Sequence, residues 1–181
     1  MKARVQEPIV WTWTKSPLGR LRLVGRDGAL SGLYFEKHRG APAPEAHWRE
    51  DLEPFAAVVA QLGEFFSGRR TAFDLDLELD GTGFQQRVWS ALREIPYGAQ
   101  VTYGELAARI GAPRAARAVG RANALNPISI IVPCHRVVAS NGSLTGYAGG
   151  IAQKSWLLDL ERSGPAMTRR GGGELSSSPE V

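Results

Sequence analysis

Three short runs of apolar, β-branched and aromatic residues follow one another near the start of the chain, and turn-forming residues separate them. Residues 16–19 (Ser-Pro-Leu-Gly) divide the first run from the second, and residues 26–28 (Arg-Asp-Gly) divide the second from the third. Runs separated by such turns are typical of strands joined as hairpins. The pattern therefore predicts an antiparallel meander with strands at residues 10–14, 21–24 and 30–35.

The periodicity then changes to helical and back. Residues 38–47 are rich in Pro, Ala and Gly and predict a loop. From Glu53 to Phe66 the apolar positions recur at helical spacing, and Gly68 lies just past the end. Residues 73–79 alternate strictly between apolar and acidic side chains, which predicts a strand with one wet face that closes the sheet.

A linker is predicted at residues 80–83 (Asp-Gly-Thr-Gly), and helical spacing dominates beyond it. Thr82 or Gly83 is expected to cap a helix from Phe84 to Glu94, which residues 95–98 (Ile-Pro-Tyr-Gly) end. A last helix is expected from Gln153 to Arg162.

Between these helices lies a pair of shorter ones. Thr102 precedes the first, residues 103–110, with Glu105 three positions on as a capping box. A Gly-Ala-Pro turn separates it from the second, residues 114–125. Two short helices joined by a glycine-containing turn form a helix-turn-helix, which serves DNA binding in some proteins and packing in others. The local sequence leaves both readings open.

Together these patterns predict an α+β protein. We expect an N-terminal α/β domain at residues 1–80, a mainly helical domain at residues 81–164 and a tail at residues 165–181. The tail, rich in Gly, Ser and Pro, has no capacity to form a core and is predicted to be disordered.

Charge is distributed unevenly along the 181 residues, although the formal net charge is only +4. Residues 1–83 carry 11 basic and 12 acidic side chains, whereas residues 84–161 carry 8 basic and 4 acidic ones. Between Leu106 and Leu158 there is no acidic residue. A stretch of one sign suggests a polyanionic partner, with a solvated basic face as the alternative.

The second helix of the pair strengthens the DNA reading. Arg114, Arg117 and Arg121 are expected to share one face, while Ala115, Ala116 and Gly120 keep the helix slim. A slim, basic helix is able to approach a duplex closely.

Cys134 is the only cysteine, which excludes an intrachain disulfide and suggests a reducing compartment. One cysteine with three scattered histidines is poor material for zinc. An apolar run is expected to deliver Cys134 to a strand end beside His135 and Arg136. Basic neighbours lower a thiol pKa, so the setting favours a nucleophile over an inert buried thiol.

A histidine next to a cysteine on a strand points the other way, so the pair needs a bend or a bridging water. The imidazole also needs an orienting partner, and Glu161 is the candidate. From the residues alone, Glu161 is equally able to pair with Arg162 or Lys154 on the surface.

Residues 133–138 (Pro-Cys-His-Arg-Val-Val) resemble the active-site signature of the O6-alkylguanine-DNA alkyltransferases, also called methylated-DNA–protein-cysteine methyltransferases. Further blocks are similar to the family in order and near their usual spacing, and the likeness covers about residues 84–161. Residues 16–35 resemble the less informative N-terminal domain. The blocks are residues 88–92, 95–98, 102–107, 115–120, 126–127 and 146–150.

The resemblance implies catalytic roles. Cys134 would accept the alkyl group, and His135, oriented by Glu161, would take the thiol proton through water. Tyr103 would donate a proton to the departing guanine and crowd the adjacent phosphate, and Asn126 would tie the second helix to the active-site turn. Packing for Tyr103 and turn formation for Asn126 are the plain alternatives.

The resemblance also implies how DNA is bound. The second helix, with Ala115, Ala116 and Gly120, would enter the minor groove, flanked by Arg114 and Arg121. Arg117 would fill the gap left by the flipped nucleotide, or simply contact phosphate. Backbone groups of Cys134, Val137 and Ala148 would read the guanine edge, with Tyr147 as a pocket wall.

As a whole, the family implies a ribonuclease H-like N-terminal domain followed by a winged helix-turn-helix-like domain. It implies a single-turnover repair protein that binds double-stranded DNA carrying O6-alkylguanine, with no cofactor and no membrane contact. We expect a monomer, with clustering on DNA open, in the cytoplasm or at a prokaryotic nucleoid. Some members bind zinc, but His38 and His47 stand without an N-terminal cysteine, so we predict none.

Two other classes of protein fit parts of the sequence. One is a non-catalytic module that recognises alkylated DNA, and the other is a Cys-His hydrolase acting on amides. The helix-turn-helix and the acid-free stretch give the hydrolase no support.

Overall fold

The computed structural model describes residues 8–26 and 28–165, so the predicted tail lies outside the described residues apart from Pro165. Three antiparallel strands form the expected meander: β1 (Val10–Ser16), β2 (Gly19–Arg26) and β3 (Ala29–Phe35). The two-residue strand β4 (Arg49–Glu50), which no pattern predicted, pairs in parallel with β1. The strand order is β3-β2-β1-β4.

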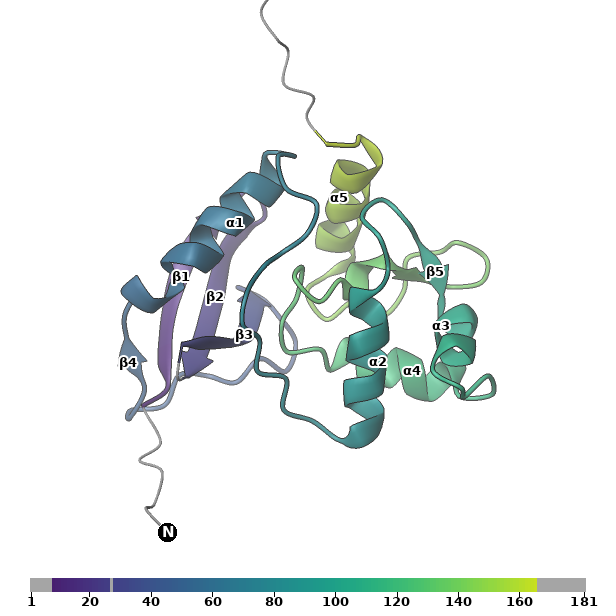
Figure 1. The fold of residues 1–181 in the computed structure, drawn as a ribbon, viewed down its shortest axis with the longest axis horizontal. Helices are drawn as coiled ribbons and strands as arrows, with labels where there is room; N and C mark the ends of the chain where they lie inside the picture. The colour runs from purple at the N-terminus through teal and green to yellow at the C-terminus, as the bar shows by residue number, and fades with distance from the viewer. Residues whose placement is uncertain (1–7, 27, 166–181) are drawn as a thin grey trace, which may run out of the picture.

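One face of this sheet is covered by a helix (Figure 1). Leu21 and Leu23 of β2 are fully buried, because alternate strand residues point to the same face. A 3-10 turn, η1 (Glu53–Phe55), leads into α1 (Ala56–Phe66), which buries Val58, Leu62 and Phe65. Gly68, with φ +71, lies just past its end, as the sequence predicted.

The predicted strand at residues 73–79 is wrong. This segment pairs with the sheet at one point only, the bridge between Leu77 and Leu30. Its alternate side chains do face the core, which explains the sequence pattern. A full ladder does not form because the same edge of β3 also pairs with residues 127–129 from the second half of the chain.

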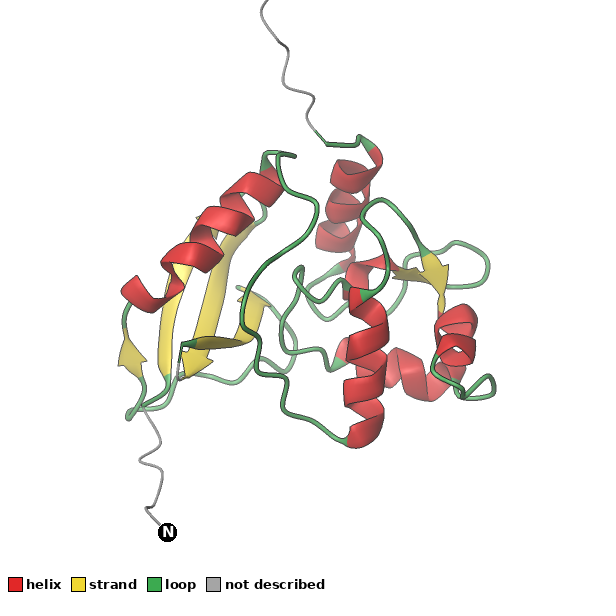
Figure 2. Cartoon of the chain, viewed as in Figure 1, coloured by secondary structure: helices red, strands yellow, loops and turns green. Residues whose placement is uncertain are grey.

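The second half is mainly helical (Figure 2). Thr82 caps α2 (Gly83–Arg93) and Thr102 caps α3 (Tyr103–Arg109), and both make complete capping boxes. Contacts join α3 to α4 (Ala116–Ala124), and α5 (Ile151–Arg162) ends the described chain. The two-residue strands β5 (Val101–Thr102) and β6 (Val137–Val138) pair in parallel beside this helix-turn-helix.

Most element boundaries differ from prediction by one or two residues, and two differences affect the site. Helix α4 begins at Ala116, so Arg114 lies in the preceding turn and does not share a helical face with Arg117 and Arg121. The run before Cys134 is a series of turns, and Cys134 opens the 3-10 turn η2 (Cys134–Arg136). The apolar residues before Cys134 are explained by burial and not by a strand, since Ile130 and Val132 are fully buried.

The outer edge of β3 joins the two halves. Leu33 N donates to Pro127 O at 2.9 Å, and Ser129 N donates to Leu33 O at 3.0 Å. One continuous hydrophobic cluster runs from Val10 of β1 to Leu157 of α5. Residues 127–129, which lead toward Cys134, therefore pair with the edge of the N-terminal sheet over a short stretch, as an added strand would.

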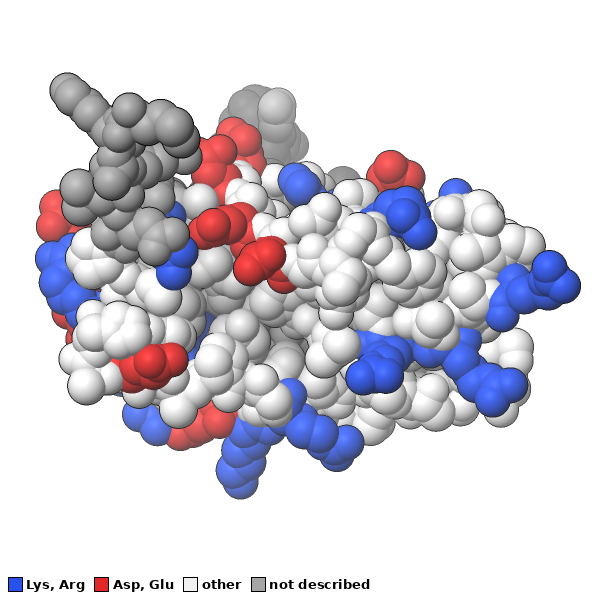
Figure 3. Space-filling model, turned by 90° about the horizontal axis from the view of Figure 1, so that it is seen from below, with Lys and Arg blue, Asp and Glu red and all other residues white. Residues whose placement is uncertain are grey.

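Basic side chains gather on the helical half. In the view of Figure 3 they spread over the right side of the molecule, where Figure 1 places α2, α3 and α4, and acidic ones are few there. Arg114, Arg117 and Arg121 are all exposed. None of the helices in the described ranges is long and apolar enough to cross a membrane.

Candidate active site

Cys134 is held by two asparagines. Its side chain is 4% exposed, and Sγ accepts a hydrogen bond from Asn126 Nδ2 at 3.1 Å. Its carbonyl oxygen accepts one from Asn123 Nδ2, a residue of α4, at 3.3 Å. These contacts hold Cys134 against α4, the second helix of the helix-turn-helix.

Asn126 also folds the preceding segment onto itself. Its Nδ2 donates to Val132 O at 2.8 Å and to Ile128 O at 3.3 Å, while Oδ1 accepts from Ile128 N at 3.0 Å. Buried amides that satisfy several backbone groups stabilise one conformation of a turn. The structure thus brings Asn126 to the place that the predicted bracing role requires.

This segment contains strained backbone. Ile130 has φ +71, the only positive φ of a non-glycine residue among the described residues, and it is fully buried. A β-branched residue in the left-handed region costs roughly 1–2 kcal/mol, so the surroundings must hold it. The Asn126 contacts on one side and the β3 edge on the other do so.

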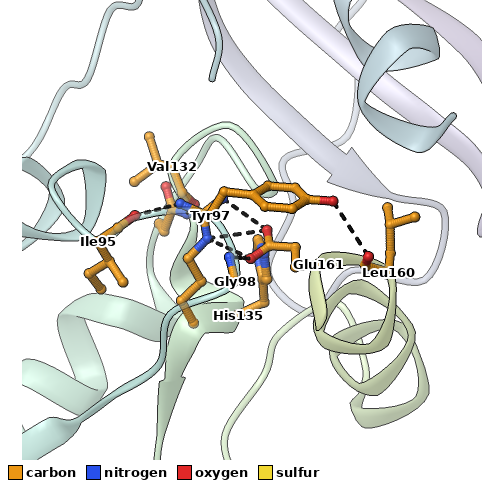
Figure 4. Close-up of polar contacts among 9 residues, drawn as sticks. Ile95, Tyr97, Gly98, Val132, His135, Leu160 and Glu161 are labelled. Atoms are coloured by element: carbon orange, nitrogen blue, oxygen red, sulfur yellow. Dashed lines mark hydrogen bonds and ion pairs between the residues drawn. The ribbon is translucent and has the colours of Figure 1, made fainter. Parts of the chain in front are cut away.

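His135 and Glu161 form a buried pair. His135 Nε2 lies 2.8 Å from Glu161 Oε1, and neither residue is more than 3% exposed. Glu161 Oε2 accepts from Gly98 N at 3.0 Å, and Figure 4 shows the carboxylate between His135 and the turn at Tyr97 and Gly98. Hydrogen bonds and nearby charges lower the pKa of Glu161 to about 2 although its burial opposes this.

An ionised Glu161 determines the tautomer of His135. A carboxylate only accepts, so Nε2 carries the hydrogen and Nδ1 keeps a free lone pair. Nδ1 is buried and has no hydrogen-bond partner within the described part of the chain. Burial lowers the pKa of His135, so the ring is neutral and available as a base at neutral pH.

Arg136 does not act on the thiol as the sequence suggested. Its guanidinium turns to Glu161, with Nη2 2.9 Å from Oε1 and Nε 2.9 Å from Oε2. Adjacent residues in a 3-10 turn point in different directions, so closeness in sequence did not give closeness in space. The alternative pairing of Glu161 with Arg162 is also wrong, because Arg162 pairs with Asp159.

Sequence reasoning missed Lys154. This lysine of α5 is fully buried, and Nζ donates to Val137 O at 2.5 Å and to Thr145 O at 3.3 Å. A signal was present, because Lys154, Leu157, Leu158 and Glu161 follow helical spacing and form one buried stripe. A lysine that shares the apolar face of a helix is expected to be buried and to bind polar groups inside the protein.

The thiol is not ionised by its surroundings alone. Burial raises the pKa of Cys134, against the lowering effects of the Asn126 hydrogen bond, the Lys154 charge and Tyr147. A protonated thiol is a weak nucleophile, so this site needs a base to remove the proton.

An open groove of about 580 Å³ lies between α3, α4 and the loop that follows β6, and Cys134 is not among its lining residues. Tyr103, which lines the groove, is close enough to Cys134 to interact with its charge. The Tyr103 ring packs over Gly120, and its hydroxyl donates to Thr145 O at 3.2 Å. Burial raises the pKa of Tyr103, so it keeps its proton. The lining residues are Tyr103, Gly104, Ala116, Arg117, Gly120, Ala124, Ala139, Ser140, Thr145 and Gly146.

The remaining predicted residues lie around this centre. Tyr147 is buried, its pKa is raised well above the ordinary value by burial and by the thiol, and its ring packs edge-on against Phe35. Ala148 O accepts from Arg39 N at 3.0 Å. Val137 O already accepts from Lys154, whereas Ala115, Arg114 and Arg121 lie outside the groove lining.

No group of three or more His, Cys, Asp and Glu residues that could hold a metal ion occurs in the ranges that the structure describes. His38 packs against Tyr34 and Phe35, with ring centroids 5.2 and 6.5 Å away.

Two family models match the chain. The 6-O-methylguanine DNA methyltransferase DNA-binding domain matches residues 83–163, and the ribonuclease-like domain of the same proteins matches residues 9–79. The chain belongs to this family. The resemblance inferred from the motifs is therefore confirmed, together with the α+β fold of a ribonuclease-like domain and a helical DNA-binding domain.

Individual members of the family are similar over most of their length. A methylated-DNA–protein-cysteine methyltransferase of Mycobacterium tuberculosis is 53% identical over 148 residues, which is 82% of this chain and 89% of the relative. One of Haemophilus influenzae is 44% identical, covering 85% and 87%. The crystal structure of Mycobacterium tuberculosis OGT in complex with DNA matches with a TM-score of 0.81 at 50% identity, covering 87% of this chain and 96% of that one.

Proposed function

We propose that this protein repairs DNA by moving the alkyl group of O6-alkylguanine in double-stranded DNA onto its own Cys134. The protein is thus a methylated-DNA–protein-cysteine S-methyltransferase. The observation that carries the proposal is a buried cysteine next to a His–Glu pair, close to Tyr103 of the groove that a basic helix-turn-helix lines.

In the proposed step, Cys134 Sγ attacks the alkyl carbon, a sulfur–carbon bond forms, and the carbon–O6 bond breaks. His135 Nδ1 takes the thiol proton through a bridging water, and Glu161 stabilises the imidazolium. Tyr103 donates its proton to the departing guanine. The raised pKa of the thiol and the free Nδ1 of His135 support this division of roles.

A guanine within a duplex must leave the stack to reach a buried thiol. We propose that α4 enters the minor groove through Ala116 and Gly120, and that Arg117 takes the place of the flipped nucleotide. Ala115, Arg114 and Arg121 would then contact the neighbouring backbone. The position of Arg117 in the groove lining and the exposure of all three arginines support this.

The guanine edge would be read by backbone groups of Cys134, Val137 and Ala148, with Tyr147 as the pocket wall. Cys134 O already accepts two bonds, from Asn123 Nδ2 and from Val137 N, whereas Val137 O accepts from Lys154 and Ala148 O accepts from Arg39 N. A carbonyl has two lone pairs, so the carbonyls of Val137 and Ala148 are better placed than that of Cys134 to accept a bond from the base.

The reaction consumes the protein. A thioether has no good leaving group, and the chain has no second thiol to exchange with it. We propose one repaired lesion per molecule and no cofactor, a monomer whose clustering on DNA is open, and a site of action in the cytoplasm or at the nucleoid.

We also propose that the chain divides near residue 80 into an N-terminal domain, residues 1–80, and a DNA-binding and active-site domain, residues 81–164. The ranges of the two family models support this division.

Intact mass after incubation with duplex DNA containing O6-methylguanine tests the function. We expect a gain of one methyl group, located on Cys134 by peptide mapping, at one methyl per protein. Binding with an unchanged mass would instead indicate a non-catalytic recognition module. Cys134→Ser should bind the same duplex and gain no mass; substantial methylation of this variant would refute the assignment of the acceptor.

A further inference from the structure

The Glu161 carboxylate is shared among three partners, His135, Arg136 and the backbone N–H of Gly98, and of these only His135 is the proposed base. Oε1 lies 2.8 Å from His135 Nε2 and accepts from Arg136 Nη2 at 2.9 Å. Oε2 accepts from Arg136 Nε at 2.9 Å and from Gly98 N at 3.0 Å. Both oxygens of a carboxylate that is 3% exposed are thus fully occupied.

Arg136 ties Glu161 to a second part of the fold. Its Nη1 donates to Ile95 O at 2.6 Å, just beyond the end of α2. The guanidinium carbon lies 5.9 Å from the centre of the Tyr97 ring, and Tyr97 Oη reaches Leu160 O of α5 at 3.4 Å (Figure 4). The planar fork of an arginine fixes both the position and the direction of a paired carboxylate.

The charges around His135 are few. In the described part of the chain, Glu161 favours the protonated ring, whereas Arg136 and Lys154 disfavour it. Cys134 lies on the same turn, and two phenols, those of Tyr97 and Tyr147, also interact with the Glu161 charge; burial is the main cause that raises the pKa of each. A protonated His135 is therefore stabilised by one carboxylate only, that of Glu161, and Arg136 already neutralises the charge of this carboxylate.

We propose that Arg136 is a positioning residue that keeps Glu161 ionised and aimed at His135 and, by sharing Oε1, restrains His135 from holding a proton at rest. Arg136 would not touch the substrate. The thiol would then stay protonated until the alkylated base arrives, and His135 would remain a free base. This inference rests on the proposed role of His135 in alkyl transfer.

The test compares two Arg→Met variants on neighbouring elements. In Arg136→Met the pairing with Glu161 is lost, whereas Arg162→Met removes an exposed pair with Asp159 on α5. NMR titration of ¹⁵N-labelled imidazoles follows His135 without DNA, with His38 and His47 in the same spectrum. We expect the His135 midpoint to rise in Arg136→Met and to stay unchanged in Arg162→Met.

Rates of reaction with free O6-methylguanine give the second readout. Removal of Arg136 should lower the rate constant at pH 6.5 by roughly tenfold or more, with partial recovery toward pH 8.5, because the base is protonated. Arg136→Lys keeps the charge and loses the fork. It should leave the midpoint near that of the wild type and lower the rate equally at every pH.

A folded Arg136→Met protein with an unchanged or lowered His135 midpoint would overturn the inference. If that variant does not fold, Arg136→Gln takes its place with the same expectation. If neither neutral variant folds, an Arg136→Lys protein that reacts as fast as the wild type would overturn it. A failure of the proposed function is distinct, since the wild-type protein itself would then not be methylated.

Discussion

The two halves of the chain differ in charge, in secondary structure and in what they bring to the site. The N-terminal half is nearly neutral, built on strands, and supplies none of the proposed acceptor, base or DNA-binding residues. The C-terminal half is basic and helical and holds all of the residues proposed for these roles. Yet the strained segment before Cys134 is held partly by Leu33 of β3, and Tyr147 packs on Phe35 of the same strand.

The comparison shows that one half of the chain provides the side chains of the candidate site, while the other half helps to hold the segment that carries them. Backbone pairing at the β3 edge needs no particular side chain, so the N-terminal half can position the site without any recognisable motif. The C-terminal half needs specific side chains, and its motifs are correspondingly easy to find. Variants in each half measure how much each one contributes to holding Cys134 and its neighbours in position.

The largest effect is expected on the C-terminal side, at Asn126. Asn126→Ala removes the bonds to the thiol and to the turn and leaves buried backbone groups unpaired, so we expect a loss of about 2–4 kcal/mol in the free energy of unfolding. Alkyl transfer should slow by about a hundredfold or more, because the thiol is displaced. Urea unfolding and methylation time courses measure both effects.

Asn141→Ala is the matched control, since this exposed asparagine accepts one bond, from Ser143 N. It should leave both quantities near the wild type. If Asn126→Ala behaved like the control, the β3 edge alone would hold the segment.

The next effect probes the contact between the halves at Gly149. An added Cβ would lie 2.3 Å from Phe35 Cδ2, so Gly149→Ala must displace the loop that carries Tyr147. We expect a loss of about 1–3 kcal/mol in stability together with slower transfer. A double-mutant cycle with Phe35→Leu, which makes room, should recover part of both.

Gly63→Ala serves as the control for this cycle, because nothing lies within 4 Å of its Cβ and the position is helical. It should be neutral or slightly stabilising. Strictly additive losses for the Gly149 and Phe35 changes would mean that the two halves do not press on each other here.

Arg117→Ala should leave the folded protein intact and affect duplex DNA alone. Because unstacking a base costs a few kcal/mol, we expect transfer from duplex DNA to slow by about tenfold or more while the reaction with free O6-methylguanine is unchanged. Arg121→Ala, which lies outside the groove lining, should weaken binding modestly without this selectivity. Equal slowing with both substrates would contradict the flipping role of Arg117.

The smallest effect is a difference in acid response. Burial lowers the pKa of His38, in the N-terminal half, from 6.5 to about 4, so the unfolded chain takes up this proton first. Stability should therefore fall as the pH drops from 6.5 toward 4. Glu161, with a pKa lowered from 4.5 to about 2, should add a further loss only below pH 4.5.

Thermal midpoints measured from pH 8 to pH 3 report both phases. His38→Phe should reduce the first phase without removing it, because burial also lowers the pKa of His135, and it should keep the second phase. A first phase of unchanged size in this variant would contradict the contribution of His38.

Local signals along the chain predicted much of the fold correctly. Helix caps and the glycine after α1 depend on neighbours within a few residues. The capping box at Thr102 and the glycine were found where predicted, and of the two candidates for the cap of α2, Thr82 or Gly83, Thr82 is the cap. The predicted strand at residues 73–79 failed because its fate depends on residues 127–129, which compete for the same edge. Strand β4 has two residues and so no periodicity to detect.

In the candidate site, too, some features were predictable from the sequence, whereas others depend on how distant segments pack. The pairing of His135 with Glu161 was inferred and is observed, because the family motif and the few carboxylates near it narrowed the choice. The direction of Arg136 depends on the 3-10 turn at Cys134, which the apolar run did not reveal. Asn123 was missed because its position on α4 looks like any polar helix residue until the thiol segment packs behind it.

The edge of β3 also bears on how the protein is made. Leu33 leaves the ribosome long before Ile128, its bridge partner, and until then only the contact at Leu30 covers that edge. An uncovered strand edge invites pairing with other chains, and contacts this far apart in sequence form slowly. A newly made molecule therefore gains a finished acceptor site only when the last third of the chain closes over the first, and crowded synthesis at high temperature would be expected to trap it before that point.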